Sequence, residues 1–273
     1  MRSYNCVVCI KQVPDTQKVT GEAMKPDGTI NRAALPAVFN PEDRNALEAA
    51  LQVKERYGGT VTVVTMGLPA ATAILREALW CGADRAVLVT DRKAAGSDTL
   101  ATSYILSQAV RRFKPDLVFC GRQAIDGDTA QVGPQIGEKL GCAVVTYLER
   151  ILRLEVEGEG GERSFATVVR DIGTGVETDR VQLPALFTVT EKFGALRPYE
   201  MRRVMKFKAA EPEVLSCDDI GAEADRCGFA GSPTCVNKIE SVVLAGGDYR
   251  EVAPTDEGIR ELVKELVDEH TIG

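Results

Sequence analysis

The chain has 273 residues, which is long enough for one or two domains with a sizeable core. Its content of 44% hydrophobic and 27% charged residues is typical of globular proteins and excludes a disordered, collagen-like or coiled-coil chain. The 33 basic and 40 acidic residues give a net charge of −7, which disfavours nucleic-acid binding because that binding depends on neutralising phosphates. No apolar run approaches the roughly 20 residues that span a bilayer, and the N-terminus has no signal-peptide cleavage pattern. We therefore expect a cytoplasmic protein without direct membrane insertion.

The use of cysteine and histidine narrows the chemistry further. The chain has 8 cysteines, most of them within apolar runs where a free thiol behaves as a small hydrophobic group. Cys6 and Cys9 form a CxxC pattern, but residues three apart on a strand point to opposite faces, so we expect neither a zinc site nor a redox pair. The only histidine is His270. This disfavours mechanisms that need a histidine base or a histidine-bound metal, and we assign no catalytic residue and no metal ligand.

The first half of the sequence alternates between apolar, β-branched runs and segments with helical periodicity. We predict strands at residues 5–13, 60–66, 85–90 and 117–121, helices at 41–57, 69–79 and 98–113, and a short helix that ends near residues 140–141. For the first helix, Asn40 suits the N-cap, Pro41 suits the first turn, and Gly58 ends the helix. Near-continuous apolar strands alternating with helices indicate an α/β fold with a doubly wound, Rossmann-like parallel sheet, in which ligands bind beyond the carboxyl ends of the strands.

The pattern changes after about residue 146. Residues 147–157 and 164–170 flank a Gly-rich turn typical of a hairpin, and residues 177–183 and 185–190 continue strand-like. We expect these segments to form an antiparallel addition to one edge of the sheet. Residues 191–208 are basic, residues 209–255 have low regular content, and residues 256–269 have the pattern of an amphipathic helix. The predicted division is an α/β domain (1–190), a basic loop (191–208) and an extended C-terminal arm (209–273).

The run GRQAIDGDTAQVGPQIGEKLG, residues 121–141, carries the clearest chemical signal because it follows a predicted strand and opens a helix. Gly127 and Gly133 allow a ligand to approach the backbone closely, Thr129 can cap the helix or donate to a phosphate, and Gln131 offers an amide. Pro134 suits the first turn, so the helix begins between residues 129 and 134. Successive amides at a helix N-terminus form an anion site. The run has neither a Walker A nor a GxGxxG spacing, and a tight turn that binds nothing is the alternative.

Other segments should converge on the same edge of the sheet. The first strand ends near Cys9, Lys11 and Asp15, Asn40 precedes a helix N-terminus, and Met66 ends the second strand. Taken singly, Lys11 is most simply a solvated surface lysine and Asn40 a helix cap. Together with the glycine-bearing loop they predict a crevice for an adenine nucleotide.

Several long motifs in order resemble the β subunit of the electron transfer flavoprotein family. They are VCIKQVPD, FNPEDRNALEAAL, CGADRAVLVTD, GRQAIDGDTAQVGPQ and VVRDIGTGVETDRVQLPALFTV, and they extend over nearly the whole chain. The resemblance implies a heterodimer with an α subunit that carries a flavin, and a nucleotide, AMP in the common form, bound by this chain. The site residues implied by the resemblance and by the loop chemistry are Cys9, Lys11, Asp15, Asn40, Pro41, Glu42, Asp43, Met66, Gly127, Asp128, Thr129, Ala130, Gln131, Val132, Gly133, Pro134 and Gln135.

A second form of the family bifurcates electrons, and the loop GDTAQVGPQ with the opening KQVPDT resembles that form. The resemblance then implies a second FAD in place of AMP, reduced by NAD(H), with electrons passed to a low-potential acceptor such as ferredoxin or flavodoxin and to an acyl-CoA dehydrogenase-type flavoenzyme. A non-bifurcating shuttle that binds AMP is the alternative within the family. Outside the family, the alternative is a stand-alone adenine-nucleotide module similar to universal stress proteins.

The basic segment 191–208 resembles the loop with which the family docks dehydrogenases. The resemblance implies a partner surface at Arg197, Tyr199, Met201, Arg202 and Arg203, with Met201 as an adaptable apolar anchor and the arginines steering an acidic partner. The order Arg197-Pro198-Tyr199 departs from the family pattern, and a solvated basic loop is the alternative. The C-terminal arm is implied to pack on the α subunit.

Overall fold

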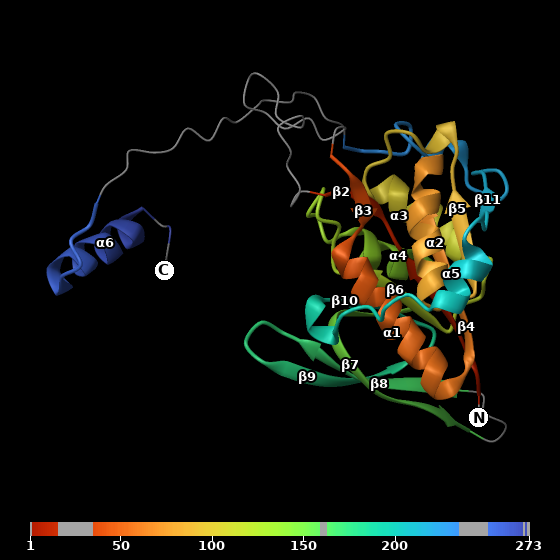
Figure 1. Ribbon diagram of the computed structural model, residues 1–273, viewed down its shortest axis with the longest axis horizontal. Coiled ribbons are helices and arrows are strands. Elements are labelled where there is room, and N and C mark those ends of the chain that lie inside the picture. The colour runs from red at the N-terminus through yellow and green to blue at the C-terminus, as the bar shows by residue number, and fades with distance from the viewer. Residues whose placement is uncertain (1, 16–34, 159–162, 235–250, 270, 272–273) are drawn as a thin grey trace.

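A computed structural model describes residues 2–15, 35–158, 163–234, 251–269 and 271. Its main sheet has nine strands in the order β11-β5-β4-β1-β6-β10-β7-β8-β9 (Figure 1). The strands from β11 to β7 pair in parallel, and only β8 and β9 are antiparallel to their neighbours. Their bounds are β1 Tyr4–Cys9, β4 Gly59–Met66, β5 Arg85–Val89, β6 Leu117–Gly121, β7 Ala143–Glu157, β8 Arg163–Asp171, β9 Val176–Gln182, β10 Ala185–Val189 and β11 Glu213–Leu215. The predicted α/β, doubly wound sheet is confirmed.

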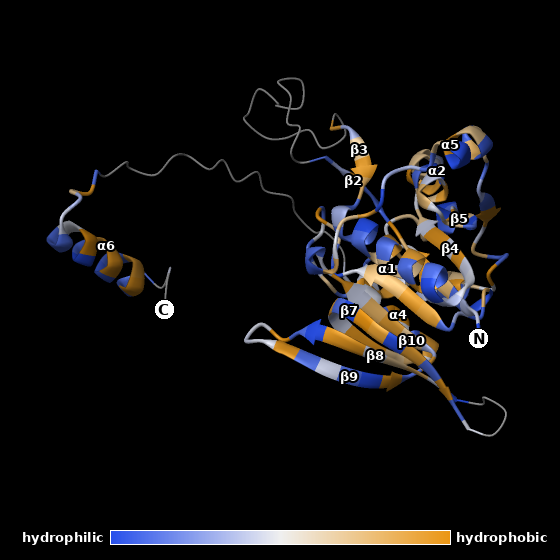
Figure 2. Ribbon diagram, turned by 60° about the horizontal axis from the view of Figure 1, so that its bottom comes forward, coloured by the Kyte–Doolittle hydropathy of each residue, from blue (hydrophilic) through white to orange (hydrophobic). Residues whose placement is uncertain are grey.

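Helices cover both faces of the parallel part of the sheet. The helices α1 (Pro41–Tyr57) and α2 (Thr72–Cys81) pack on one face, and α3 (Thr99–Arg111) and α4 (Val132–Leu140) pack on the other. Along β1, Cys6 belongs to the first core cluster and Cys9 to the second. The prediction that these two thiols point to opposite faces is therefore confirmed. Figure 2 shows hydrophobic residues concentrated on the strands between these helices.

Local sequence signals placed α1 accurately. It begins at Pro41, carries Glu42 and Asp43 in its first turn, and ends before Gly58, whose φ is 78°. A positive φ is costly for residues with a Cβ, so glycine at this position stops the helix. The helix α2 begins at Thr72 rather than residue 69, because Pro69–Ala71 form a short 3₁₀ turn.

Two strand predictions need correction. The predicted strand 5–13 is two strands, since β1 ends at Cys9 and β2 (Gln12–Pro14) pairs antiparallel with β3 (Ala37–Phe39). The antiparallel addition consists of β7 to β9 only. β10 instead lies between β6 and β7 and is parallel to both. All five of its residues are buried, which is the pattern of an inner parallel strand, whereas β9 at the edge is mostly exposed.

The segments after residue 190 contain more regular structure than the sequence predicts. The basic segment includes the helix α5 (Met201–Phe207), which packs on α2. In residues 209–234, β11 adds to the sheet beside β5, and Leu215, Cys217 and Cys227 are buried in the core shared with α3. This part of the predicted arm therefore packs on the domain itself. The helix α6 (Asp256–Asp268) has the predicted amphipathic pattern, and Figure 2 shows hydrophobic and hydrophilic residues alternating along it. Its residues Ile259, Leu262, Val263 and Val267 are exposed.

Within the described ranges, no helix combines the length and apolar character that crossing a bilayer would require.

Candidate functional site

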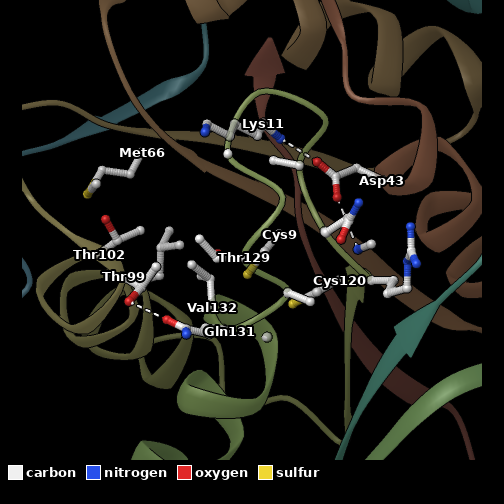
Figure 3. A pocket seen from close by; sticks show the side chains of 18 of the residues that line it. Cys9, Lys11, Asp43, Met66, Thr99, Thr102, Cys120, Thr129, Gln131 and Val132 are labelled. Carbon is white, nitrogen blue, oxygen red and sulfur yellow. Dashed lines mark hydrogen bonds between the residues drawn. The ribbon is translucent and has the colours of Figure 1, made fainter. Parts of the chain in front are cut away.

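A cavity of about 400 Å³ opens at the carboxyl ends of β1, β4 and β6. The strand order passes from β4 through β1 to β6, so the chain winds away from β1 in both directions. This is the switch point at which ligands bind in doubly wound sheets. Figure 3 shows Lys11 and Asp43 on one side of the cavity, Thr99, Gln131 and Val132 on the other, and Cys9 and Cys120 between them.

The loop between β6 and α4 forms one wall of the cavity and has an unusual backbone. Asp128 and Ala130 have φ angles of 49° and 53°, in the left-handed region that non-glycine residues rarely adopt. Such strain is concentrated at functional sites, where the surroundings hold it in place. The amides of the five residues from Thr129 to Gly133 make no hydrogen bond within the described part of the chain. The helix α4 begins at Val132 and receives no side-chain cap from Gln131. An anion is therefore the natural partner of these amides.

The helix α3 also begins at the cavity, but its N-terminus is already satisfied. The Asp98 carboxylate accepts hydrogen bonds from the amides of Leu100 and Ala101, at 2.9 and 3.0 Å. A second anion at this end would meet the negative charge of Asp98, whereas α4 offers free amides. The Thr99 hydroxyl donates to Oε1 of Gln131 at 2.9 Å, which ties the two helix ends together (Figure 3). The structure thus distinguishes the α4 wall, whose first amides have no partner among the described residues, from the hydroxyl-bearing α3 wall.

The first turn of α1 hydrogen-bonds to the loop between β6 and α4. Asn40 occupies the N-cap position but makes no capping hydrogen bond. Instead its Nδ2 donates to the carbonyl of Gln123 at 2.9 Å, and its Oδ1 accepts from the amide of Ile125 at 3.2 Å. Glu42 accepts from the Gln123 amide at 2.9 Å. The cap predicted for the Asn40 side chain is therefore wrong, because the distant loop competes for its hydrogen bonds.

Both cations that line the cavity are paired with carboxylates. Lys11 Nζ lies 2.8 Å from Asp126, and Arg122 Nη2 lies 2.8 Å from Glu42. The hydrogen bond to Glu42 raises the pKa of Arg122. Asp43 differs from these groups because burial raises the pKa of its carboxyl to about 7. The described lining therefore offers no unpaired cation, whereas its carboxylates Asp43, Asp98 and Asp128 have no ion pair within the described residues. An anion in the cavity would depend on backbone amides.

Two thiols lie beneath the cavity. Cys9 and Cys120 are direct partners in the β1–β6 register, and both are buried. The contact with Cys9 and the burial of the side chain raise the pKa of the Cys120 thiol well above its usual value. A protonated, buried thiol is a poor nucleophile, so we interpret the pair as packing. No group of three or more metal-ligating side chains occurs among the described residues.

The predicted site residues divide into those that line the cavity and those that support it. Lining residues are Cys9, Lys11, Asp43, Met66 and every residue from Gly127 to Gly133. Asp15, Asn40, Pro41, Glu42, Pro134 and Gln135 lie outside the lining; Gln135, for example, accepts a hydrogen bond from Ser103 of α3 at 2.9 Å. Sequence reasoning missed the wall of α3 and the start of the loop: Ser97, Asp98, Thr99, Thr102, Leu106 and Gly121, Arg122, Gln123, Ala124. The Asp98-Thr99 pair at the start of the predicted helix was the sequence feature that could have indicated that α3 lines the cavity.

The residues predicted to contact a partner protein are not equally free to do so. Arg197 pairs with Glu48 at 3.0 Å, the Tyr199 hydroxyl donates to Glu77 at 3.0 Å, and Arg203 donates to the carbonyl of Leu79 at 2.7 Å. These three side chains fix the segment on α1 and α2. Met201 is 70% exposed and Arg202 is exposed as well.

Comparison with known proteins identifies the class. Residues 27–220 match the family model described as the electron transfer flavoprotein domain. The chain is 41% identical over 268 residues to an electron transfer flavoprotein subunit beta from Clostridium acetobutylicum, with 98% of this chain and 100% of the relative covered. It is 43% identical to a protein FixA from Azorhizobium caulinodans, with 94% and 93% covered. It is 39% identical to an acryloyl-CoA reductase electron transfer subunit gamma from Anaerotignum propionicum, with 100% of both covered.

A doubly wound domain with a cavity at its switch point, matching this model over most of its length, is an electron transfer flavoprotein domain. More particularly, the chain belongs to the family of electron transfer flavoprotein β subunits. Membership of this family implies an electron-transfer role and an α-subunit partner.

Proposed function

We propose that the cavity binds the adenosine-phosphate part of a nucleotide, with the phosphate on the amides of Thr129–Gly133 at the start of α4. The observation that carries this proposal is the run of five amides without a partner in the described chain, at a helix N-terminus that no side chain caps. An anion there gains both hydrogen bonds and the favourable end of the helix dipole. The hydroxyls of Thr99 and Thr102 on the α3 wall suit the ribose and base.

The nucleotide proposed is FAD, the second flavin of a bifurcating heterodimer. Lys11 and Met66 line the cavity. We propose that a group larger than AMP would extend out of the cavity toward the partner subunit. The bound flavin would supply hydride and electron transfer, with NAD(H) as the donor. The residues of this chain bind the adenosine half, hold its phosphates and orient it through the loop; Asp15, Asn40, Pro41, Glu42, Pro134 and Gln135 support the loop and its helices.

AMP in the same site is the second candidate, in a non-bifurcating shuttle. The cavity of about 400 Å³ favours it, because this volume lies at the small end of the roughly 300–1,000 Å³ of ligand pockets. AMP would fill it without a contribution from the α subunit.

The name of one relative supports one of the proposed electron acceptors. An acyl-CoA dehydrogenase-type flavoenzyme is supported by the relative named as a subunit of acryloyl-CoA reductase. Ferredoxin or flavodoxin is proposed as the low-potential acceptor of the bifurcating form, and no named relative bears on it. Met201 and Arg202, with the fixed Arg197, Tyr199 and Arg203 beside them, form the proposed docking segment. The exposed apolar residues of α6 suit packing on the α subunit. We propose a cytoplasmic location for the complex.

Nucleotide counting tests the proposal. The chain is produced with its α subunit, the complex is denatured, and the released nucleotides are quantified by chromatography. Two FAD per heterodimer supports the bifurcating form, and one FAD with one AMP supports the shuttle. A colourless complex without nucleotide would contradict both forms.

A further inference from the structure

Asp43 joins the ends of two neighbouring strands where their own pairing stops. The β1–β6 register ends at Cys9 and Cys120. Just beyond it, Oδ2 of Asp43 accepts from the amide of Lys11 at 2.7 Å, and Oδ1 accepts from the amide of Gly121 at 3.0 Å (Figure 3). One carboxyl therefore replaces the missing ladder between the two strand ends that face the cavity.

The fit around this carboxyl is tight. Asp43 is 6% exposed, and a Cβ built on Gly121 would lie 2.4 Å from its Oδ1. Position 121 therefore has to be glycine for the carboxyl to reach the amide. Asn40 and Glu42 hydrogen-bond to the same loop farther along, at Gln123 and Ile125. The Asn40 side chain also hydrogen-bonds to Asp43, which opposes the effect of burial on the pKa of that carboxyl.

The surroundings of Asp43 do not provide a compensating cation. The charged and titratable groups near it are Glu42 from α1, the Cys120 thiol from β6, Lys11 from the end of β1 and Arg122 from the loop. Lys11 Nζ is paired with Asp126 and Arg122 with Glu42. No ion pair to Asp43 occurs within the described residues. A buried carboxyl without a counterion is costly to keep, so stability alone does not account for it.

We propose that Asp43 is a positioning residue: its ionised carboxylate, by accepting from both amides, sets the spacing between the β1 end and the phosphate-binding loop and so controls nucleotide affinity. The inference rests on the proposed nucleotide site. In the carboxylic acid form one oxygen carries a proton that faces an amide N–H, so one of the two hydrogen bonds is lost. Because burial raises the pKa of this carboxyl to about 7, nucleotide affinity falls as pH drops through neutrality.

Asp43→Asn tests the inference in the intact heterodimer, with AMP as the probe and binding measured calorimetrically from pH 6 to 8.5. The amide retains one acceptor but turns an NH₂ group toward the other backbone N–H. We expect affinity about tenfold weaker than wild type at pH 8, the loss of one charge-assisted hydrogen bond. The phosphate of AMP titrates near pH 6 in both proteins, so the difference between their profiles isolates Asp43.

Asp84→Asn is the matched control. Asp84 also accepts from a strand amide, that of Val61 at 2.9 Å, but at the opposite end of the sheet. We expect this variant to keep the wild-type affinity and pH profile for AMP. Wild-type affinity in Asp43→Asn at all pH values would overturn the inference, as would an affinity loss of equal size in Asp84→Asn.

Hydrogen exchange of the wild-type heterodimer supplies a test without ligand or variant. Exchange rates corrected for intrinsic pH dependence should rise at the amides of Lys11 or Gly121 as pH falls from 8 to 6, and stay constant at Val61. Constant protection at both cavity amides would overturn the inference. If wild type binds neither AMP nor FAD, the proposed function fails instead, and the exchange result still stands on its own.

Discussion

Both ends of the sheet use aspartates to tie strands together, but the two ends differ in how the charge is balanced. At the amino ends, Asp84 accepts from Val61 and pairs with Lys54 at 2.5 Å, and Asp116 accepts from Asn5 and pairs with Arg2 at 2.5 Å. At the carboxyl ends, Asp43 accepts from two amides and is buried without a cation in the described chain. The amino end is arranged for stability, whereas the carboxyl end retains an uncompensated charge beside the cavity.

The comparison is tested most strongly by the pH dependence of folding. Burial raises the pKa of Asp43 from 3.8 to about 7, so folding favours its protonated form. Its contribution to stability is present below about pH 4 and is lost as pH rises through about 7, with an upper limit of about 4 kcal/mol. Asp43→Asn lacks this dependence. As pH rises from 5 to 8, the free energy of unfolding of wild type, measured by urea denaturation, should therefore fall relative to that of Asp43→Asn.

Asp84→Asn is the control for that measurement, since it removes a carboxylate that has its own lysine. We expect this variant to be less stable than wild type at each pH but to keep the wild-type slope between pH 5 and 8. If the free energy of unfolding of Asp43→Asn varied with pH as that of wild type does, the two ends of the sheet would not differ in how the charge of their aspartates is balanced.

A smaller effect is expected from adding a charge at the free helix end. Gln131→Glu places a carboxylate beside the amides that open α4, at the position proposed for the phosphate. At a separation of about 6 Å and an effective dielectric constant of about 20, the repulsion weakens AMP binding about a hundredfold. The fold should tolerate the change, because acidic residues near a helix N-terminus are favourable. Affinity is measured by calorimetry and folding by circular dichroism.

Gln108→Glu, the same substitution on α3 away from the cavity, is the matched control and should bind AMP as wild type does. Equal binding by Gln131→Glu and wild type would remove α4 as the phosphate site.

The smallest effects should come from the two lysine pairs. Lys54→Met removes the partner of Asp84 and one hydrogen bond to the Gly82 carbonyl, which should cost about 1 kcal/mol of stability without altering AMP affinity. Lys11→Met removes a cation from the cavity lining and leaves Asp126 without its lysine, which should weaken AMP binding a few-fold, with little change in stability. Thermal denaturation and calorimetry on both variants separate the two outcomes. A loss of AMP affinity in Lys54→Met together with a loss of stability in Lys11→Met would contradict the proposed difference between the two ends of the sheet.

Much of the fold and part of the site could be predicted from local signals. The bounds of α1 were predicted because Pro41 and Gly58 act on their own neighbourhoods, and the free N-terminus of α4 because a glycine-bearing loop follows an apolar strand. The wall formed by α3 could not be assigned to the site, because Thr99 and Thr102 lie more than 20 residues before the loop they face. The position of β10 was predicted wrongly, because strand order depends on long-range packing.

The sequence by itself determined the class of fold, the family and the glycine-bearing loop at the cavity, since periodicity, glycine placement and ordered motifs are local properties. Only the tertiary structure decided what the first turn of α1 does. Asn40, Glu42 and Asp43 resemble an ordinary acidic helix start, yet their side chains bind backbone groups some 80 residues away. Polar side chains hydrogen-bond to groups that folding brings close to them. Those partners can be far away in the sequence, so the sequence alone does not identify them.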